Sequence, residues 1–162
     1  MNLIVTNKFD RDCAALADRH YPRRRHGNRQ FMPPGETIVI RDRIGAMVFG
    51  WSRQRFRWDG ERGFYCSIFR NESGRLSSEV ILECERIAVL TWGQSRAFTY
   101  ITPSEISSCN PGFCFKCAGW KFVRENSDGK HVLEKLTLET PIDALSLGHA
   151  SGDLRPGFDR EV

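Results

Sequence analysis

The chain has 162 residues, of which 40% are hydrophobic and 27% charged. This size and composition suit one globular domain with its own core and exclude a disordered or fibrous protein. No segment approaches the roughly 18 consecutive apolar residues of a membrane span, and residues 1–18 lack the basic and apolar regions of a secretory signal. We therefore expect a cytoplasmic protein that has no membrane partner.

The net charge of +4 is unevenly distributed along the chain. Residues 1–62 carry 13 Lys/Arg against 7 Asp/Glu, and the remainder carries 11 against 13. Guanidinium groups pair well with phosphate oxygens, so this half is a candidate DNA-binding surface. An ordinary solvated basic surface would have the same composition. The arginines that we expect to contact DNA are Arg23, Arg24, Arg25, Arg53, Arg55 and Arg57.

Hydrophobic periodicity and turn residues predict the first elements in chain order. A helix over 10–19 precedes a loop rich in proline and arginine at 20–34. The predicted strands are 36–41 and 44–51, joined as a hairpin by two residues at 42–43, and 64–69, which follows a polar loop at 52–63. A turn over 70–76 leads to a long helix at 78–92, which Ser77 can cap, and a strand follows at 97–101.

Aromatic and basic residues alternate in the polar loop at 52–63 and just before it. Trp51, Phe56 and Trp58 interleave with the arginines there. Such a loop can stack on nucleobases while its cations bind phosphates. A hairpin tip with exposed charges would have a similar sequence.

The segment N-P-G-F-C-F-K-C-A-G-W at 110–120 is the most distinctive in the chain. It predicts a short helix, because Asn110 suits an N-cap, Pro111 suits the first turn and Gly119 suits the end. The last predicted strands, 122–124 and 131–138, flank the turn residues Asp128 and Gly129.

The whole order predicts an α/β fold with a mixed sheet, in one domain over residues 1–140. Residues 141–162 are poorer in hydrophobic residues and richer in Gly, Pro and Asp, which predicts a loosely packed or flexible tail.

Three of the six cysteines lie close together in the sequence. Cys109, Cys114 and Cys117 reproduce the C-x4-C-x2-C spacing of plant-type iron–sulfur proteins, but that motif needs a fourth cysteine downstream, and none follows. A zinc site would need two close ligand pairs, and the sequence offers one. We therefore expect reduced, partly buried thiols and no metal.

The capped helix before Gly119-Trp120, together with the order of the preceding elements, resembles the GNAT acyltransferase superfamily. In that family an Asn precedes a helix with the pattern Y-x-x-x-G-F. The resemblance implies a mostly antiparallel twisted sheet flanked by helices, and an N-acyltransferase that uses acetyl-CoA or a related acyl-CoA. Phe115 stands where the family has a tyrosine, which often protonates the leaving thiolate.

His20-Tyr21 after the first helix, with Gly119-Trp120, also resembles the phage Mom-like DNA modification proteins. That resemblance implies a phage-encoded enzyme in the host cytoplasm that acts on an amine of DNA or of a modified base. Thr102 and Phe115 replace an Asp and a Tyr of the Mom pattern. Three alternatives stay open: an acetyltransferase for a small amine, a catalytically degenerate GNAT-fold protein that binds nucleic acid, and a metal-dependent version of the Mom reaction.

The candidate site residues follow from this resemblance and from helix-end electrostatics. The N-terminus of the long helix would bind a pyrophosphate, and the backbone of strand 64–69 would donate to a thioester oxygen. His20 would accept the proton, with Glu72 as the alternative base or as a partner for an arginine, and Tyr21 would position the substrate. The expected acyl-CoA-binding residues are Ser67, Ile68, Phe69, Arg70, Gly74, Arg75, Ser77, Ser78 and Asn110.

Overall fold

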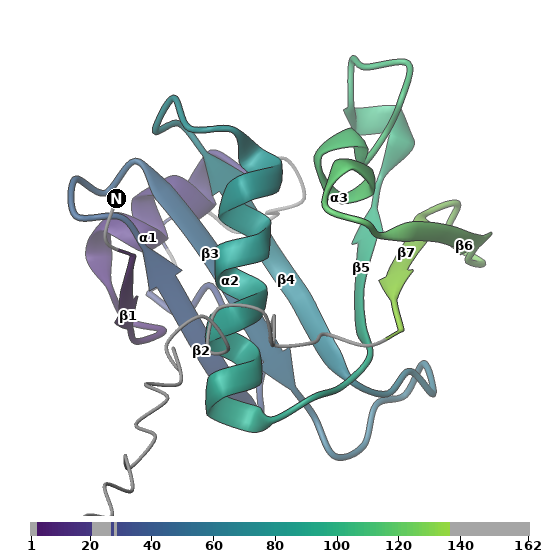
Figure 1. The fold of residues 1–162 in the computed structure, drawn as a ribbon, viewed down its shortest axis with the longest axis horizontal. Helices are drawn as coiled ribbons and strands as arrows, with labels where there is room; N and C mark the ends of the chain where they lie inside the picture. Colours follow the sequence, from purple (N-terminus) through teal and green to yellow (C-terminus); the bar gives the residue numbers. More distant parts are fainter. Residues whose placement is uncertain (1–2, 21–26, 28, 137–162) are drawn as a thin grey trace, which may run out of the picture.

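The computed structural model describes residues 3–20, 27 and 29–136, which form one seven-stranded sheet with helices on both faces (Figure 1). The strands are β1 (Ile4–Thr6), β2 (Glu36–Arg41), β3 (Met47–Arg53), β4 (Phe64–Asn71), β5 (Ala97–Ile101), β6 (Lys121–Glu125) and β7 (His131–Lys135). The helices are α1 (Arg11–Asp18), α2 (Ser77–Trp92), α3 (Phe113–Cys117) and the 3-10 turn η1 (Pro103–Glu105). The predicted tail and the predicted site residues Tyr21, Arg23, Arg24 and Arg25 lie outside the described residues.

The strands are ordered β1-β2-β3-β4-β5-β7-β6, and every neighbouring pair is antiparallel except β4 with β5. Helix α2 connects these two parallel strands, as a parallel pair requires a long crossover. The predicted α/β fold with a mixed, mostly antiparallel sheet is confirmed. Among the described residues, no helix combines the length and the apolar character needed to cross a membrane.

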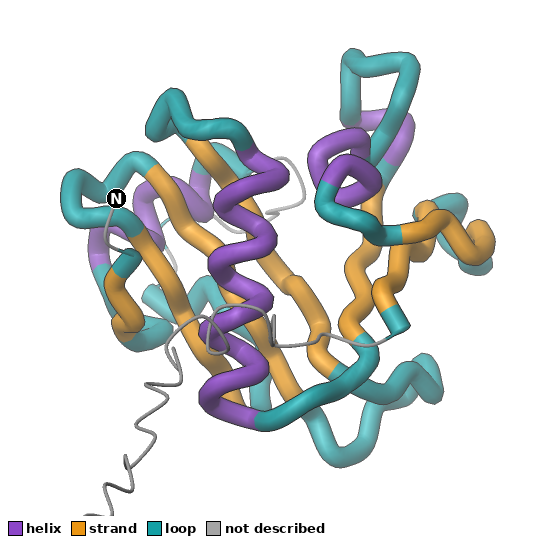
Figure 2. The backbone as a smooth tube through the Cα atoms, viewed as in Figure 1, coloured by secondary structure: helices purple, strands orange, loops and turns teal. Residues whose placement is uncertain are grey.

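Two apolar clusters lie on opposite faces of the sheet, because side chains alternate along each strand. Ile38 and Ile40 of β2 pack in the cluster with α2, whereas Val39 packs in the cluster with α1. Figure 2 shows α2 crossing one face, with α1 behind the sheet. The predicted helix at 10–19 is α1, and Asp10 caps it, because its carboxylate accepts the N–H groups of Asp12 and Cys13.

The larger cluster is organised around the fully buried indole of Trp51. Its N–H donates to the carbonyl oxygen of Cys84 in α2 at 2.9 Å, and its ring stacks on Trp120 at a centroid distance of 6.2 Å. The buried Glu85 accepts from the Trp120 indole and from the Lys135 ammonium, each at 2.6 Å. These hydrogen bonds satisfy polar groups that would be costly to bury alone, and they fix α2 against β3, β7 and the end of α3.

Several predicted strand limits are wrong. The connection between β2 and β3 spans residues 42–46 rather than two, because the buried Asp42 carboxylate accepts the N–H groups of Ala46 and Met47 and Gly45 turns with a φ of +71°. Trp51, predicted beside the basic loop as a stacking residue, belongs to the core. Strand β1 was not predicted, since three partly exposed residues at a sheet edge carry too little periodicity.

Two predicted helix caps are also wrong. Helix α2 begins after Leu76 with no side-chain cap, because the Ser77 hydroxyl accepts from the Asn71 side-chain amide at 3.1 Å instead. Helix α3 begins at Phe113 after Gly112, whose φ of +73° is left-handed, so Asn110 lies in the preceding turn. The predicted end at Gly119, with a φ of +88°, is confirmed.

Gly63 holds the start of β4 against the chain that leads into β5, and we expect Gly63→Ala to be strongly destabilising. Its φ is +114°, and an added Cβ would overlap the Arg96 carbonyl oxygen, which also accepts the Phe64 N–H at 2.8 Å. Gly60→Ala is a matched control, because its φ is +74° but no atom lies within 4 Å of an added Cβ.

We expect Gly60→Ala to lower the free energy of unfolding by about 1–2 kcal/mol through backbone strain, and Gly63→Ala to lower it by roughly 1–3 kcal/mol more through overpacking. Urea denaturation of the two variants measures both losses. Equal losses would contradict the close approach at Arg96.

Candidate functional site

Strands β4 and β5 run side by side for only two residues and then separate. The paired residues are Phe64 with Ala97 and Tyr65 with Phe98. One further hydrogen bond crosses the gap, from the Thr99 hydroxyl to the Cys66 carbonyl oxygen at 2.9 Å. Figure 1 shows the strands diverging beyond this point, with β5, β7 and β6 turned away from the rest of the sheet.

A β-bulge lies in β4 where the separation begins. Cys66 opposes Trp51 and Ile68 opposes Gly50, so Ser67 is an extra residue with no partner on β3. A bulge bends a strand and increases its twist. The bulge therefore helps β4 to turn away from β5 while β4 keeps its pairing with β3.

The backbone of β4 is available to a ligand beyond the bulge. The Glu72 N–H donates to the Ala46 carbonyl oxygen at 2.7 Å, and backbone groups alternate in direction along an antiparallel strand. The Phe69 backbone groups, three residues earlier, therefore point away from β3 and toward the gap. An amide in this position can donate to a ligand oxygen.

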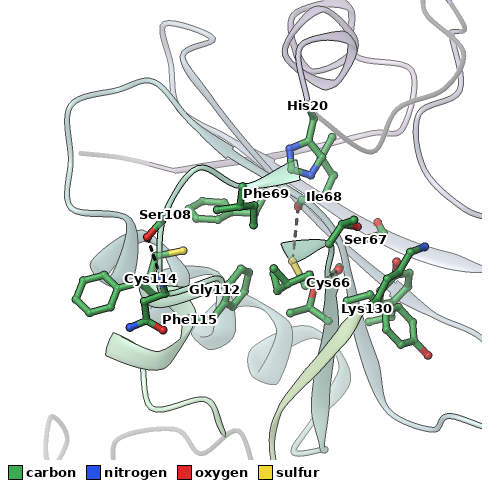
Figure 3. Close-up of a pocket in the computed structure, with 18 residues that line it drawn as sticks. His20, Cys66, Ser67, Ile68, Phe69, Ser108, Gly112, Cys114, Phe115 and Lys130 are labelled. Carbon is green, nitrogen blue, oxygen red and sulfur yellow. Dashed lines mark hydrogen bonds between the residues drawn. The ribbon is translucent and has the colours of Figure 1, made fainter. Parts of the chain in front are cut away.

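A cavity of about 420 Å³ occupies the gap (Figure 3), a volume within the range of small-molecule sites. Cys66 and Thr99 line it from the face that carries α2, and Tyr65 and Tyr100 from the opposite face. The cavity therefore passes through the sheet. Its remaining walls come from residues 67–69 and 101–102, the segment 106–115, His20 and Lys130.

The cavity brings together five of the predicted site residues: His20, Ser67, Ile68, Phe69 and Asn110. Their elements are far apart in the sequence, and Figure 3 shows His20 approaching from the end of α1 on the opposite side from α3. The other six described site residues lie between the end of β4 and the start of α2 and are not in the lining: Arg70, Glu72, Gly74, Arg75, Ser77 and Ser78.

His20 is neutral at neutral pH. Burial, and then the positive charge of Arg70, lower the pKa of its imidazole from 6.5 to about 4. A base works best when its pKa lies near the operating pH, so His20 is a weak base. Its uncharged ring suits a hydrogen-bonding partner that orients a substrate.

Glu72, the alternative base, is held between two guanidinium groups outside the cavity lining. Its carboxylate contacts Arg19 at 2.8 Å and Arg70 at 2.5 Å. Hydrogen bonds from Arg19 and then Arg70 lower its pKa to about 2. The structure therefore shows the second of its two predicted roles, as a partner for arginine.

The turn before α2 presents backbone groups more than free cations. The Arg75 guanidinium donates to both carboxylate oxygens of Glu83. Gly74 has a φ of +77°, and no atom lies within 4 Å of an added Cβ. Because no side chain caps α2, the N–H groups of Ser77 and Ser78 at its positive end are placed for an anion.

Helix α3 supplies two aromatic side chains, Phe113 and Phe115, and one titratable group to the cavity. Phe115 is buried, with edge-to-face contacts to Phe69 and Trp120 at 5.9 and 4.9 Å. Cys114 beside it is only partly buried, and burial raises the pKa of its thiol, which keeps the thiol protonated. The Asn110 side-chain oxygen accepts from the Lys116 ammonium at 2.5 Å.

Sequence reasoning missed several polar residues of the cavity, among them Thr99, Tyr100, Cys114 and Lys130. The Tyr100 hydroxyl donates to Asp59 at 2.7 Å, and burial followed by this hydrogen bond raises its pKa to about 12. Thr99 could have been noticed as a polar residue on the core face of a strand. Nothing in the sequence places Lys130 here.

The arginines of the basic loop differ in their availability. Arg53 pairs with Glu36 at 2.5 Å and lies over the Trp92 ring, and Arg57 pairs with Asp59. Arg55 is exposed, with no ion pair to any described residue.

The chain matches none of the protein-family models with which it was compared, and a search of curated proteins likewise found no match. The chemistry of the cavity therefore follows from its own groups, which include a neutral imidazole, the protonated thiol of Cys114, several hydroxyls, the Lys130 ammonium and the backbone of β4. Within the described ranges, no three His, Cys, Asp or Glu side chains are grouped to hold a metal ion.

The lowered pKa of His20 predicts a pH dependence of stability. The folded state binds fewer protons than the unfolded state between about pH 4 and 6.5, so the free energy of unfolding rises with pH in this window and levels off above it. Relative to His20→Asn, the wild type should lose on the order of 1 kcal/mol between pH 6.5 and about pH 5, below the limit of about 1.4 kcal/mol per pH unit.

Urea denaturation of both proteins across this range measures the difference. Parallel pH profiles for wild type and His20→Asn would show that the imidazole is not buried in its neutral form.

Proposed function

We propose that the protein is a GNAT-like N-acyltransferase that uses acetyl-CoA or a related acyl-CoA and transfers the acyl group to an amine of DNA or of a modified base. The observation that carries this proposal is the cavity through the sheet between β4 and β5. It allows donor and acceptor to enter from opposite faces and meet inside the domain. Holding two reactants in one orientation supplies much of the rate enhancement of a transfer reaction.

The donor would lie along β4 and the start of α2. The pyrophosphate would bind the N–H groups of Ser77 and Ser78, beside Gly74, where the backbone is unobstructed. The acyl carbonyl oxygen would accept from the β4 backbone near Phe69. Bound there, the acyl-CoA supplies an activated acyl group at the centre of the cavity.

Proton transfer would involve residues on both sides of the gap. The acceptor amine must lose a proton, which the neutral imidazole of His20 would accept and then release to solvent, because its lowered pKa does not let it keep the proton. The departing sulfur must gain a proton, which Phe115 cannot provide. The protonated Cys114 thiol lines the same cavity; its Sγ would donate this proton and regain one from solvent.

A second candidate is a nucleic-acid-binding protein that has lost transferase activity. Two observations favour it: Phe115 is part of the core, and the arginines of the turn, Arg70 and Arg75, are already paired with carboxylates. This candidate predicts that no acyl-CoA stabilises the protein. A transferase for a small amine, by contrast, would bind acyl-CoA without affinity for DNA.

A pair of substitutions at Gly74 tests the donor site. Asp and Asn have nearly the same size and both tolerate a positive φ, so Gly74→Asp and Gly74→Asn differ mainly in charge. We expect acetyl-CoA to raise the melting temperature of wild type and Gly74→Asn. Gly74→Asp should bind about tenfold more weakly, or about 1.4 kcal/mol, because its carboxylate repels the pyrophosphate.

Free CoA and ADP serve as further ligands in the same thermal-shift assay, because both carry the pyrophosphate without the acyl group. If none of the three ligands stabilises the wild type, the transferase proposal is overturned and the binding protein is the better account. If Asp and Asn weaken binding equally, the pyrophosphate does not lie at this turn.

A further inference from the structure

A second cavity, of about 350 Å³, adjoins the first on the face of the sheet opposite α2. Tyr65, Tyr100 and Lys130 line both cavities, so the second cavity leads to the opening between β4 and β5. Its other walls are residues 57–59 of the loop between β3 and β4, and residues 124 and 126–128 of the β6–β7 hairpin.

The loop wall is held in place by a partly buried network of hydrogen bonds. The Arg57 guanidinium forms two hydrogen bonds with the Asp59 carboxylate, at 3.0 and 2.6 Å, and lies 4.6 Å from the Tyr65 ring centroid and 5.2 Å from that of Phe98. Asp59 also accepts from Tyr100. Arg57 is therefore a structural residue, and its charge is already balanced.

This fixed loop presents two aromatic side chains to solvent. Trp58, which lines the cavity, is 93% exposed, and Phe56 is 88% exposed. Because neighbouring residues anchor the loop, the folded chain holds both rings in this exposed position. Planar exposed side chains beside a cavity are suited to stacking on another planar group.

The hairpin wall supplies unpaired polar groups. No carboxylate of the described residues lies within ion-pair distance of the Lys130 ammonium. The Asn126 side-chain oxygen accepts the N–H groups of Asp128 and Lys130, which leaves its NH2 group as a donor. The Asp128 carboxylate is exposed and is an acceptor.

We propose that the second cavity binds a single unstacked nucleotide, with its base on the Trp58 indole and a phosphate near the Lys130 ammonium. The NH2 group of Asn126 and the carboxylate of Asp128 offer the donor and the acceptor that a base edge requires. The role of this nucleotide as acceptor rests on the proposed function, but its binding does not. A lysine side chain of another protein fits this cavity less well as a ligand, because Lys130 lies in the wall and the loop between β3 and β4 carries three arginines against two acidic residues.

The test uses the full chain without acyl-CoA. A fluorescein-labelled single-stranded DNA of about ten nucleotides, within the span of known single-strand sites, is titrated by fluorescence anisotropy. The same sequence as a duplex and free dAMP as a competitor form the other arms. We expect Trp58→Ala to weaken single-strand binding at least tenfold and Trp58→Phe to retain most of it.

Leu90→Ala is the matched control, because Leu90 is also a large exposed apolar residue (78%) but lies on α2, across the sheet. Competition by dAMP would identify a free nucleotide as the source of the ligand, and its absence would identify the polymer; both support the site. The proposal is overturned if the wild type binds no single strand, or if Trp58→Ala binds within twofold of wild type.

Two further results separate this site from the donor site. Duplex binding that equals single-strand binding and survives Trp58→Ala would indicate contacts to the phosphate backbone alone and would also overturn the proposal. Trp58→Ala should keep the thermal shift with acetyl-CoA. Single-strand binding without any such shift would instead refute the transferase and leave the nucleotide site standing.

Discussion

The structure depends on how little of β4 is paired with β5. A parallel pair that continued to the end of both strands would place ladder hydrogen bonds where the cavity is, and the sheet would separate its two faces completely. The pair ends after Tyr65 and Phe98, and the bulge at Ser67 turns β4 away. The Thr99 hydroxyl satisfies the first carbonyl group that the missing ladder leaves. The opening between β4 and β5 therefore begins without leaving the buried Cys66 carbonyl group unpaired.

The rest of the domain keeps this gap from closing or widening. Trp51 and Glu85 attach α2 to β3 and to β7, which belong to the two parts of the sheet that the gap divides. Helix α2 therefore spans the division on one face. On the other face, the Arg57–Asp59–Tyr100 network connects the loop after β3 to β5. The same three residues line the second cavity. They therefore both hold the loop in place and form part of the proposed nucleotide site.

Local patterns predicted the fold better than the site. Strands β2 and β5 have the predicted limits, because their apolar residues lie between clear turn residues. The caps at Ser77 and Asn110 could not be read correctly, since each side chain hydrogen-bonds to a residue six positions away, Asn71 or Lys116, and this choice depends on how the intervening turn folds. Gly112 precedes α3 in a left-handed conformation. This start of the helix depends on local backbone geometry, which the sequence pattern does not specify.

The same limit applies to charge. The sequence indicates a basic N-terminal half, but it does not say which arginines already have a partner. In the structure Arg41 contacts Asp10 and Asp12, and Arg19 contacts Glu72. The positive charge that remains for an anionic partner is smaller than composition suggests. The cavity likewise joins segments 110 residues apart in the chain, such as His20 and Lys130, and only the three-dimensional arrangement reveals it.

The outer strand β6 has a consequence for how copies of the domain behave in crowded solution. All five of its residues are exposed, and a shift in register beside Phe122 leaves Val123 with no partner on β7. An exposed, regular edge strand is a template for pairing with another chain, and irregular register and flanking charges remove that template. Lys121, Arg124 and Glu125 supply those charges. This edge of the sheet is thereby protected against strand-to-strand aggregation, although it exposes two apolar side chains.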